Sequence, residues 1–295
     1  MRDSISPQLA PFLAADAEIA ILEYGIPGCR VRNPSPGLKA NRDYFSNPVW
    51  AKGYLRHVHR DPAFRQRWLR ATQGWDGLIV VDLGCGPGNL GAALGGKPAM
   101  LLGIDISLQA LKLAQEIGYT PLHADAHDVP LISGFADVVA INATLHHCDD
   151  MYRVLATGAR LVKPGGLLIT DHDPQLTAYD FRGPGLWLWN FRVPLYRVLR
   201  RGSHADPIEQ SSMLATEVHH NPGDGVVAKR YIEILEPLGF DVRLYVHNNL
   251  GGAEVLDGQI GRAKWEVRAA QLLSGMDVNS PAAAITLMCI ARRRA

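Results

Sequence analysis

Apolar runs and helix-like periodicities alternate along the chain from residue 78 to its end. Short apolar runs predict buried strands, and they fall at 78–83, 100–105, 120–123, 136–142, 167–171, 241–247 and 284–291. Between these runs, apolar residues recur at helical spacing at 90–94, 108–117, 151–161, 227–238 and 261–273. Strands that alternate with helices pair in parallel and carry helices on both faces of the sheet. The pattern therefore predicts an α/β fold with a seven-stranded, mostly parallel sheet.

The N-terminal part of the chain, before this alternation begins, follows a different pattern. Residues 10–24 have helical spacing, and helix-breaking residues gather at 33–37. Asp61-Pro62 places a capping side chain before a proline, which is typical of a helix start. We therefore predict a helical N-terminal cap at residues 1–75 and one α/β domain at residues 76–295.

Composition and charge restrict the classes of protein to consider. The 295 residues include 30 Lys and Arg and 29 Asp and Glu, for a net charge of +1, so no overall field directs the chain to nucleic acid. The four cysteines form no Cys-x-x-Cys pair, which fits a reduced compartment and disfavours a disulfide framework or a thiolate zinc site. No apolar run approaches the ~20 residues of a spanning helix, and no secretory signal is recognisable. We expect a cytoplasmic protein without a membrane span.

Three glycines at alternate positions follow the first strand of the predicted domain. They lie in the sequence Asp82-Leu83-Gly84-Cys85-Gly86-Pro87-Gly88-Asn89. Gly84 permits a tight turn, while Gly86 and Gly88 let a ligand approach the backbone amides. A glycine-rich turn alone is found in many nucleotide-binding folds. Asp82, two positions before the first glycine, makes the motif more specific.

An acidic residue, Asp105, ends the second predicted strand. One predicted helix and this strand separate it from Gly88. In dinucleotide enzymes an acid near this position binds the ribose, because a carboxylate can accept from both hydroxyls of a vicinal diol. The structural alternative is an N-cap for the helix at 108–117. Because the glycine turn precedes Asp105 at the right spacing, we predict that Asp105 binds a ribose diol.

These motifs, taken in order, resemble those of class I S-adenosylmethionine-dependent methyltransferases. The resemblance includes the Asp-x-Gly-x-Gly-x-Gly motif at 82–88, Asp105, and the turn Lys163-Pro164-Gly165-Gly166 before the fifth strand, and it is strongest over 78–171. It implies a Rossmann-like sheet with helices on both faces. It also implies S-adenosyl-L-methionine as the cofactor and S-adenosyl-L-homocysteine as its product.

The resemblance also implies which residues bind the cofactor. Asp125 would accept a hydrogen bond from the adenine amino group and Ala126 would donate its backbone N–H to the ring, although a plain polar turn is an alternative there. Asn142 ends the fourth strand. The expected cofactor-binding residues are Asp82, Gly84, Cys85, Gly86, Gly88, Asn89, Asp105, Ile106, Asp125, Ala126 and Asn142.

Methyl transfer requires an aligned nucleophile and, where the nucleophile carries a proton, a group to remove it. The acceptor is expected over the carboxyl ends of the strands, where open α/β sheets bind ligands. A histidine with a pKa of about 6.5 could take the proton. The catalytic candidates near these strand ends are His172, His220, Glu217 and His147. Packing, cofactor contact and metal binding remain alternatives for His146-His147, and an exposed loop remains one for 217–220.

We considered metal binding by His172, His219 and His220. Histidines from separate loops can converge, but none of them has the i, i+4 spacing of helical metal ligands. We therefore predict no metal site.

The segment 174–216 is an insertion between the fifth strand and the helix that follows it. Trp187, Trp189 and Phe191 alternate with arginines, and no acid occurs from 181 to 205. The segment could form a lid over an apolar pocket, lie on a membrane, bind RNA, or pack on the N-terminal cap. We predict a substrate lid.

These features predict an enzyme that methylates a small, largely apolar or aromatic metabolite at O, N or C, with secondary-metabolite biosynthesis as a candidate pathway. Three alternatives remain open: an RNA or protein methyltransferase, a protein of this fold that uses bound S-adenosylmethionine for another reaction, and a non-catalytic subunit. The expected partner is a small-molecule acceptor rather than nucleic acid, and a homodimer is left open.

Overall fold

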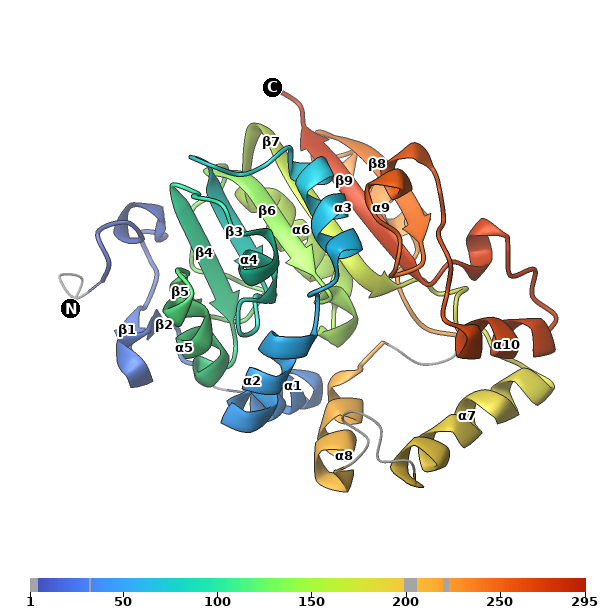
Figure 1. Ribbon diagram of the computed structural model, residues 1–295. Helices are drawn as coiled ribbons and strands as arrows, with labels where there is room; N and C mark the ends of the chain where they lie inside the picture. Colours follow the sequence, from blue (N-terminus) through green and yellow to red (C-terminus); the bar gives the residue numbers. More distant parts are fainter. Residues whose placement is uncertain (1–4, 32, 199–205, 220–222) are drawn as a thin grey trace.

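The computed structural model describes residues 5–31, 33–198, 206–219 and 223–295. Within them, one mixed sheet crosses the molecule and carries helices on both faces (Figure 1). The strand order is β1-β2-β5-β4-β3-β6-β7-β9-β8. The strands from β5 to β7 pair in parallel, whereas β9 is antiparallel to both β7 and β8. The predicted α/β class is confirmed.

All seven predicted strands are present. They are β3 (Ile79–Leu83), β4 (Met100–Asp105), β5 (Thr120–His123), β6 (Ala136–Asn142), β7 (Val162–Pro174), β8 (Phe240–His247) and β9 (Thr286–Arg293). The largest difference is in β7, which was predicted only at 167–171. It is longer because Val162 pairs with Ala136 at one end and Pro174 pairs with Thr286 at the other.

Helices occur at each position predicted for the α/β domain. They are α4 (Asn89–Leu94), α5 (Leu108–Glu116), α6 (Met151–Leu161), α9 (Ala228–Leu235) and α10 (Trp265–Leu273). Short 3-10 helices lie at η2 (Ala10–Phe12), η3 (Glu23–Gly25), η4 (Leu145–His147), η6 (Ala253–Asp257) and η7 (Pro281–Ala283).

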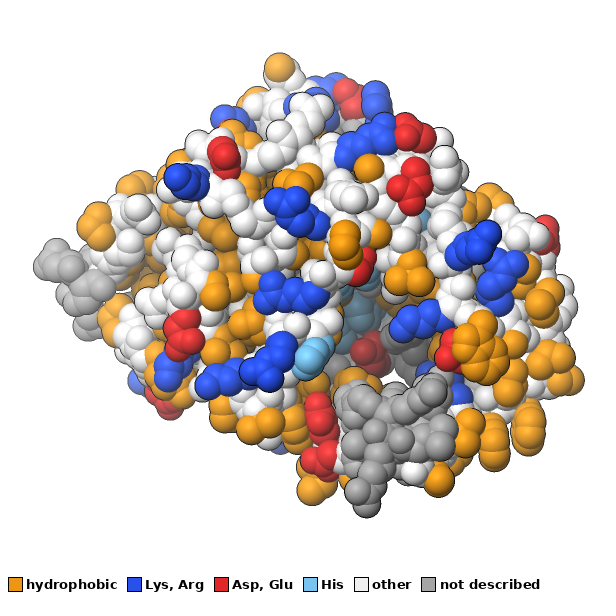
Figure 2. Space-filling model, viewed as in Figure 1, with side chains coloured by type: hydrophobic (Ala, Val, Ile, Leu, Met, Phe, Trp, Pro, Cys, Tyr) orange, Lys and Arg blue, Asp and Glu red, His pale blue; other side chains and the backbone are white. Residues whose placement is uncertain are grey.

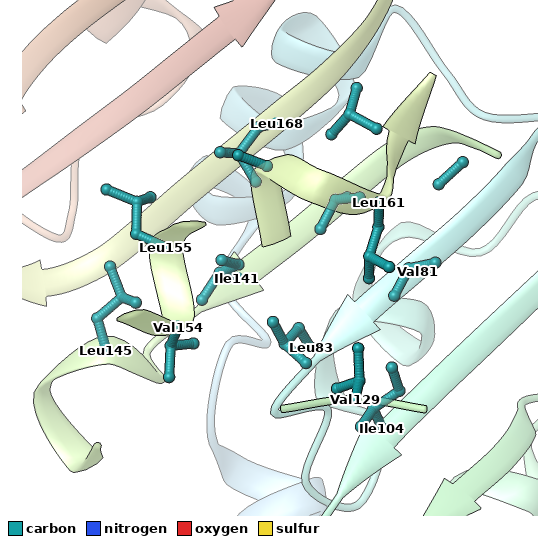
Figure 3. Packing of buried hydrophobic residues seen from close by; sticks show 14 of the residues in the cluster. Val81, Leu83, Ile104, Val129, Ile141, Leu145, Val154, Leu155, Leu161 and Leu168 are labelled. Carbon is teal, nitrogen blue, oxygen red and sulfur yellow. The ribbon is translucent and has the colours of Figure 1, made fainter. Parts of the chain in front are cut away.

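The core is divided by the sheet because successive strand residues point to opposite faces. On one face, Ile141 lies beside Val154 and Leu155 of α6, as Figure 3 shows, and Val81 belongs to the same buried cluster. On the other face, Val80 contacts a cluster that includes Trp68. Each face of the sheet is therefore covered, and the polar strand ends are the places left for a site.

The N-terminal segment, residues 1–75, differs from the predicted helical cap. The helix predicted at 10–24 is wrong, because this stretch contains η2, the short strand β1 (Ala20–Ile21) and η3. It is followed by β2 (Pro27–Gly28), which pairs in parallel with β5 and antiparallel with β1. Hydrogen bonding at the sheet edge, such as that from Cys29 N to His123 O at 2.9 Å, outweighs the local helical periodicity. The sheet consequently has nine strands rather than seven.

Three helices follow: α1 (Pro36–Ser46), α2 (Pro48–His57) and α3 (Pro62–Thr72). Helix α1 was not predicted, since its start lies in the cluster of helix breakers. That cluster is a cap: Ser35 Oγ accepts from Leu38 N at 3.1 Å and proline occupies the first turn. Figure 1 shows α1 and α2 beyond the carboxyl ends of the parallel strands.

The insertion at 174–216 forms two helices in its described part, α7 (Gly183–Val198) and α8 (Pro207–Thr216). Helix α7 packs against α10, and α8 packs against α1. None of the helices in the described ranges has both the length and the apolar character needed to cross a bilayer.

Candidate functional site

A cavity lies at the carboxyl ends of β3, β4 and β6. About 790 Å³ of space lies between its wall atoms, and part of that space is open to solvent. The cavity is lined by all the predicted cofactor-binding residues except Gly88 and Asp125. Segments that are far apart in the sequence are therefore brought to one place.

The glycine turn has positive φ angles at Gly84, Gly86 and Gly88. A side chain at Gly84 would overlap Thr144, and one at Gly88 would come within 2.6 Å of Ile117 Cδ1. Gly86 differs, because a Cβ there would meet no atom within 4 Å although the residue is buried and lines the cavity. Gly84 and Gly88 thus allow the turn to pack, whereas Gly86 keeps space open for a ligand.

Asp105 connects the end of β4 to the glycine turn. Its Oδ2 accepts from Gly86 N at 2.9 Å and its Oδ1 accepts from Ser107 N at 2.8 Å. Burial raises the pKa of Asp105, and the backbone N–H groups of Ser107 and Gly86 oppose that shift. The N-cap of α5 is Ser107, whose Oγ accepts from Ala110 N. The cap role considered for Asp105 is therefore wrong, and its oxygens keep lone pairs for a ligand.

Asp82 stabilises the segment after the glycine turn through a hydrogen bond to Tyr119. Its Oδ2 accepts from the Tyr119 hydroxyl at 2.7 Å, and that hydroxyl accepts from Gly91 N at 2.8 Å. Burial raises the pKa of Asp82 to about 7, although the hydrogen bond from Tyr119 lowers it. Asp82 therefore holds the start of α4 through Tyr119 as well as lining the cavity.

Replacing Asp82 with asparagine is expected to change how stability depends on pH. A carboxyl whose pKa is raised from 3.8 to about 7 on folding stabilises the protein fully only below pH 3.8, and that contribution is lost as pH rises to 7. Relative to wild type, the free energy of unfolding of Asp82→Asn should rise by about 2 kcal/mol between pH 5 and pH 8. Urea denaturation at the two pH values measures this. Asp128→Asn, at an exposed position, is the control. If the free energies of unfolding of Asp82→Asn and wild type differed by the same amount at both pH values, the raised pKa of Asp82 would be contradicted.

Three polar atoms of cavity-lining residues are buried without a hydrogen-bond partner. They are Asn89 Oδ1, Asn142 Oδ1 and His59 Nε2. The Asn89 side chain is held in place because its Nδ2 donates to Tyr54 O at 3.0 Å and to Val58 O at 2.9 Å. Since buried polar groups are nearly always hydrogen-bonded, these atoms fit a ligand with amino and hydroxyl groups, such as an amino-acid-bearing nucleoside.

Asp125 does not line the cavity itself but lies between two residues that do, Ala124 and Ala126, and it is held by its neighbour His127. Its Oδ1 accepts from His127 N at 2.9 Å and pairs with His127 Nδ1 at 2.6 Å. Burial raises the pKa of Asp125, but these hydrogen bonds outweigh it and the pKa is lowered. Ala126 lines the cavity. The adenine contacts predicted for this pair remain a prediction.

The predicted catalytic residues occupy different places. His147 lines the cavity, and its Nδ1 donates to the carbonyl oxygen of Thr216 at 2.7 Å, which leaves Nε2 as its lone-pair atom. Burial, together with the neighbouring His146, lowers the pKa of His147 to about 4. Glu217 Oε2 lies 3.5 Å from His146 Nε2. Histidine side chains are visible in a hollow near the centre of the face in Figure 2.

His172 does not line the cavity. Its ring lies behind that of His59, with 4.6 Å between ring centroids, and its Nδ1 is 3.3 Å from Asp171 Oδ2. His220 lies outside the described residues. Of the four candidates, His147 is thus the one that the structure places in the cavity wall.

Behind the cavity, a buried ion pair fixes the end of β7. Arg67 Nε donates to Asp171 Oδ2 at 3.0 Å, and both side chains are fully buried. His247 Nε2 lies 2.8 Å from Asp171 Oδ1. Burial raises the pKa of Asp171, but the charges of Arg67, His172 and His247 outweigh it and hold that pKa well below its usual value.

The wall opposite the strand ends comes from the N-terminal helices, which were not assigned to the site from the sequence. Leu38, Phe45 and Tyr54 contribute apolar and aromatic surface there, beside Asn41 and His59. Among the described residues of 174–216, none lines the cavity. The lid role of that insertion remains a prediction. Two contacts bring the insertion near the cavity wall: α8 packs on α1, and Thr216 O accepts from His147 Nδ1.

Comparison with known proteins gives consistent matches. A family model described as a methyltransferase domain matches residues 81–170. Ubiquinone biosynthesis O-methyltransferase of Leptothrix cholodnii is 30% identical over 147 residues, covering 46% of this chain and 62% of that protein. An uncharacterized methyltransferase of Mycobacterium bovis is 34% identical over 139 residues, covering 44% of this chain and 68% of that protein. The chain spans about half to two thirds of the ubiquinone-pathway relatives that it matches.

A solved structure has the same fold. A phosphoethanolamine N-methyltransferase of Haemonchus contortus, in complex with phosphomonomethylethanolamine and S-adenosylhomocysteine, superimposes with a TM-score of 0.52. The match covers 86% of this chain and 60% of that one at 13% identity. At this identity the likeness concerns the fold alone.

Proposed function

Because this chain belongs to the class I S-adenosylmethionine-dependent methyltransferases, we propose that it transfers a methyl group from S-adenosylmethionine to a small, largely apolar or aromatic acceptor. The observation that carries this proposal is the cavity itself. It joins the glycine turn, Asp105 and the orphaned amide oxygens of Asn89 and Asn142 to an aromatic wall on α1 and α2.

The residues divide into a cofactor end and an acceptor end. Asp105 binds the ribose diol through its carboxylate, and Gly86 provides backbone that a ligand can approach. Asn142 and Asn89 accept from the amino and hydroxyl groups of the cofactor. When bound, the cofactor supplies an electrophilic methyl group on a sulfonium centre.

The acceptor end lies between Tyr54, Phe45 and His147. The aromatic rings, 5.2 Å apart in an edge-to-face arrangement, exclude water and favour a flat acceptor. His147 Nε2 has a lone pair that can accept a proton, and the Glu217 carboxylate lies beside the His147 ring. We therefore assign proton removal to this end of the cavity. The names of the ubiquinone-pathway relatives, which are O-methyltransferases, favour an oxygen atom as the nucleophile.

Replacing Asp105 with alanine is expected to weaken binding of S-adenosylhomocysteine more than tenfold. The loss of a charge-assisted hydrogen bond is worth roughly 1.5–3 kcal/mol, and a tenfold change corresponds to about 1.4 kcal/mol. Calorimetric titration measures the affinity, with Asp128→Ala as an exposed-acid control. Unchanged affinity in Asp105→Ala would refute the ribose assignment, and binding of NAD⁺ in place of S-adenosylhomocysteine would refute the proposed function.

The transfer step has its own test. Wild-type protein is incubated with methyl-labelled S-adenosylmethionine and a panel of phenols, catechols and aromatic amines. Label recovered in an acceptor supports the proposal and names the nucleophilic atom. Cofactor cleavage with no label in any acceptor would instead support a different reaction.

A further inference from the structure

We infer that His146, His147 and Glu217 form a binding site for a divalent transition-metal cation, with zinc as the best fit. Each of these residues offers one ligand atom, and these atoms all lie within 4.8 Å of one another. His146 and His147 belong to η4, directly after β6, and Glu217 is the C-cap residue of α8. Binding of the cation is independent of the proposed function, whereas its role in methyl transfer rests on that function.

The two segments that supply the ligands are fixed to each other by the backbone. His219 N donates to His146 O at 2.9 Å, and His147 Nδ1 donates to Thr216 O at 2.7 Å. Zinc binds imidazole nitrogen and carboxylate oxygen at about 2.0–2.2 Å. Since His146 Nε2 and Glu217 Oε2 are already 3.5 Å apart, small side-chain rotations bring the atoms to this distance from one cation.

Hydrogen bonds on the far side of each imidazole support the same conclusion. His146 Nδ1 lies 2.8 Å from Asp173 Oδ1, and His147 Nδ1 faces the Thr216 carbonyl oxygen. A carboxylate or carbonyl oxygen next to Nδ1 keeps the imidazole proton on that nitrogen. Nε2 of each ring is then the nitrogen that can bind the cation. This arrangement is the usual second shell of metal-binding histidines.

The set of donor atoms selects the kind of cation. Two imidazoles and one carboxylate are the ligands of many catalytic zinc sites, in which a fourth position stays open. Mg²⁺ prefers oxygen ligands and is a poor match. No thiolate is required, so the scattered cysteines do not argue against this site.

The position of His147 in the cavity wall links the cation to the acceptor. A cation there stabilises negative charge on an acceptor hydroxyl as its proton leaves to solvent. The oxygen lone pair then forms the bond to the methyl carbon while the sulfur–methyl bond breaks and its electron pair stays on sulfur. With the cation bound, His147 acts as a ligand rather than as a base.

This site was not predicted from the sequence, and the prediction that there is no metal site is revised by this inference. The ligands come from two segments that are far apart in the chain, and two of them are adjacent in sequence, so no spacing rule identifies them. Metal binding by His146-His147 was considered from the sequence but not favoured. His172 and His219 are not members of the cluster, and His220 lies outside the described residues.

The test is a zinc titration of chelator-treated, dialysed protein, followed by competition with a chromophoric zinc indicator. Wild type is expected to bind one Zn²⁺ per chain, and excess Mg²⁺ should not displace it. Glu217→Gln and His147→Ala should weaken binding at least about a hundredfold, because loss of even a second-shell partner costs roughly 10–100-fold. The control is His219→Ala, which removes a nearby imidazole that lies outside the cluster.

Binding of S-adenosylhomocysteine separates this inference from the proposed function. Glu217 does not line the cavity, so Glu217→Gln should bind S-adenosylhomocysteine as wild type does, which also shows that the variant is folded. Equal zinc affinity in wild type, Glu217→Gln and His147→Ala would overturn the metal site, as would an equal loss in His219→Ala. Failure of wild type to bind S-adenosylhomocysteine while it still binds zinc would overturn the proposed function and leave the metal site standing.

Discussion

Replacing Arg67 with alanine is expected to lower the free energy of unfolding by about 3–5 kcal/mol, the usual cost of removing one partner from a buried ion pair. Arg67 and Asp171 are both fully buried, and Arg67 Nε donates to Asp171 Oδ2 at 3.0 Å. Arg67 Nη1 also donates to the Gly251 carbonyl oxygen. Without Arg67, His172 and His247 are the remaining neighbours among the three whose charges lower the pKa of Asp171 most.

Arg70 provides a matched control within α3. It pairs with Asp257, but 43% and 55% of the two side chains are exposed. Exposed ion pairs contribute roughly 0–1 kcal/mol, so Arg70→Ala should change stability little. Urea denaturation measures the free energy of unfolding of both variants. Equal decreases in Arg67→Ala and Arg70→Ala would show that the buried ion pair contributes no more stability than the exposed one.

The sign of the pH dependence gives a second measurement on Arg67→Ala. Because the pKa of Asp171 is depressed in the folded state, its contribution to stability is present above its unfolded pKa and is lost as pH falls through its folded pKa. Arg67→Ala removes part of that depression. The stability difference between the variant and wild type should therefore shrink as the protein is taken to acid pH.

The sequence was sufficient to predict the central sheet because its signals are local. The run 100–104 contains no polar side chain, and a strand buried on both faces is recognisable from such a run alone. The glycine turn and Asp105 could be assigned together because strand ends of a parallel sheet meet at one edge. Asn142 was assigned to the cofactor from the family resemblance, and the structure places it in the cavity wall.

The remaining features depend on contacts between distant segments. Strand β2 exists because β5 offers an unpaired edge, and the helical periodicity at 10–24 contains no trace of that edge. The start of α1 lies among prolines that look like a loop until Ser35 is seen as a cap. Phe45 and Tyr54 form a cavity wall only because the N-terminal helices pack over the strand ends. Hydrophobic periodicity predicts that a helix forms but not where in the fold it packs.

Replacing Gly86 with alanine is expected to weaken binding of S-adenosylhomocysteine by roughly tenfold to a hundredfold, the range that follows from about 1–3 kcal/mol of overpacking. Gly86 is buried and lines the cavity, yet a Cβ built on it meets no atom within 4 Å. The added methyl group must therefore occupy cavity space that the cofactor would use. Stability should fall only by the cost of a non-glycine residue at φ +52°, about 1–2 kcal/mol.

Gly77 separates the two effects of this substitution. Its φ is +72° and a Cβ there also meets nothing within 4 Å, but Gly77 is exposed and is not part of the cavity. Gly77→Ala should therefore lose about as much stability as Gly86→Ala while keeping wild-type affinity in calorimetric titration. Full affinity in Gly86→Ala would mean that the space beside Gly86 is not occupied when S-adenosylhomocysteine binds, and the cofactor would then have to lie elsewhere than under the glycine turn.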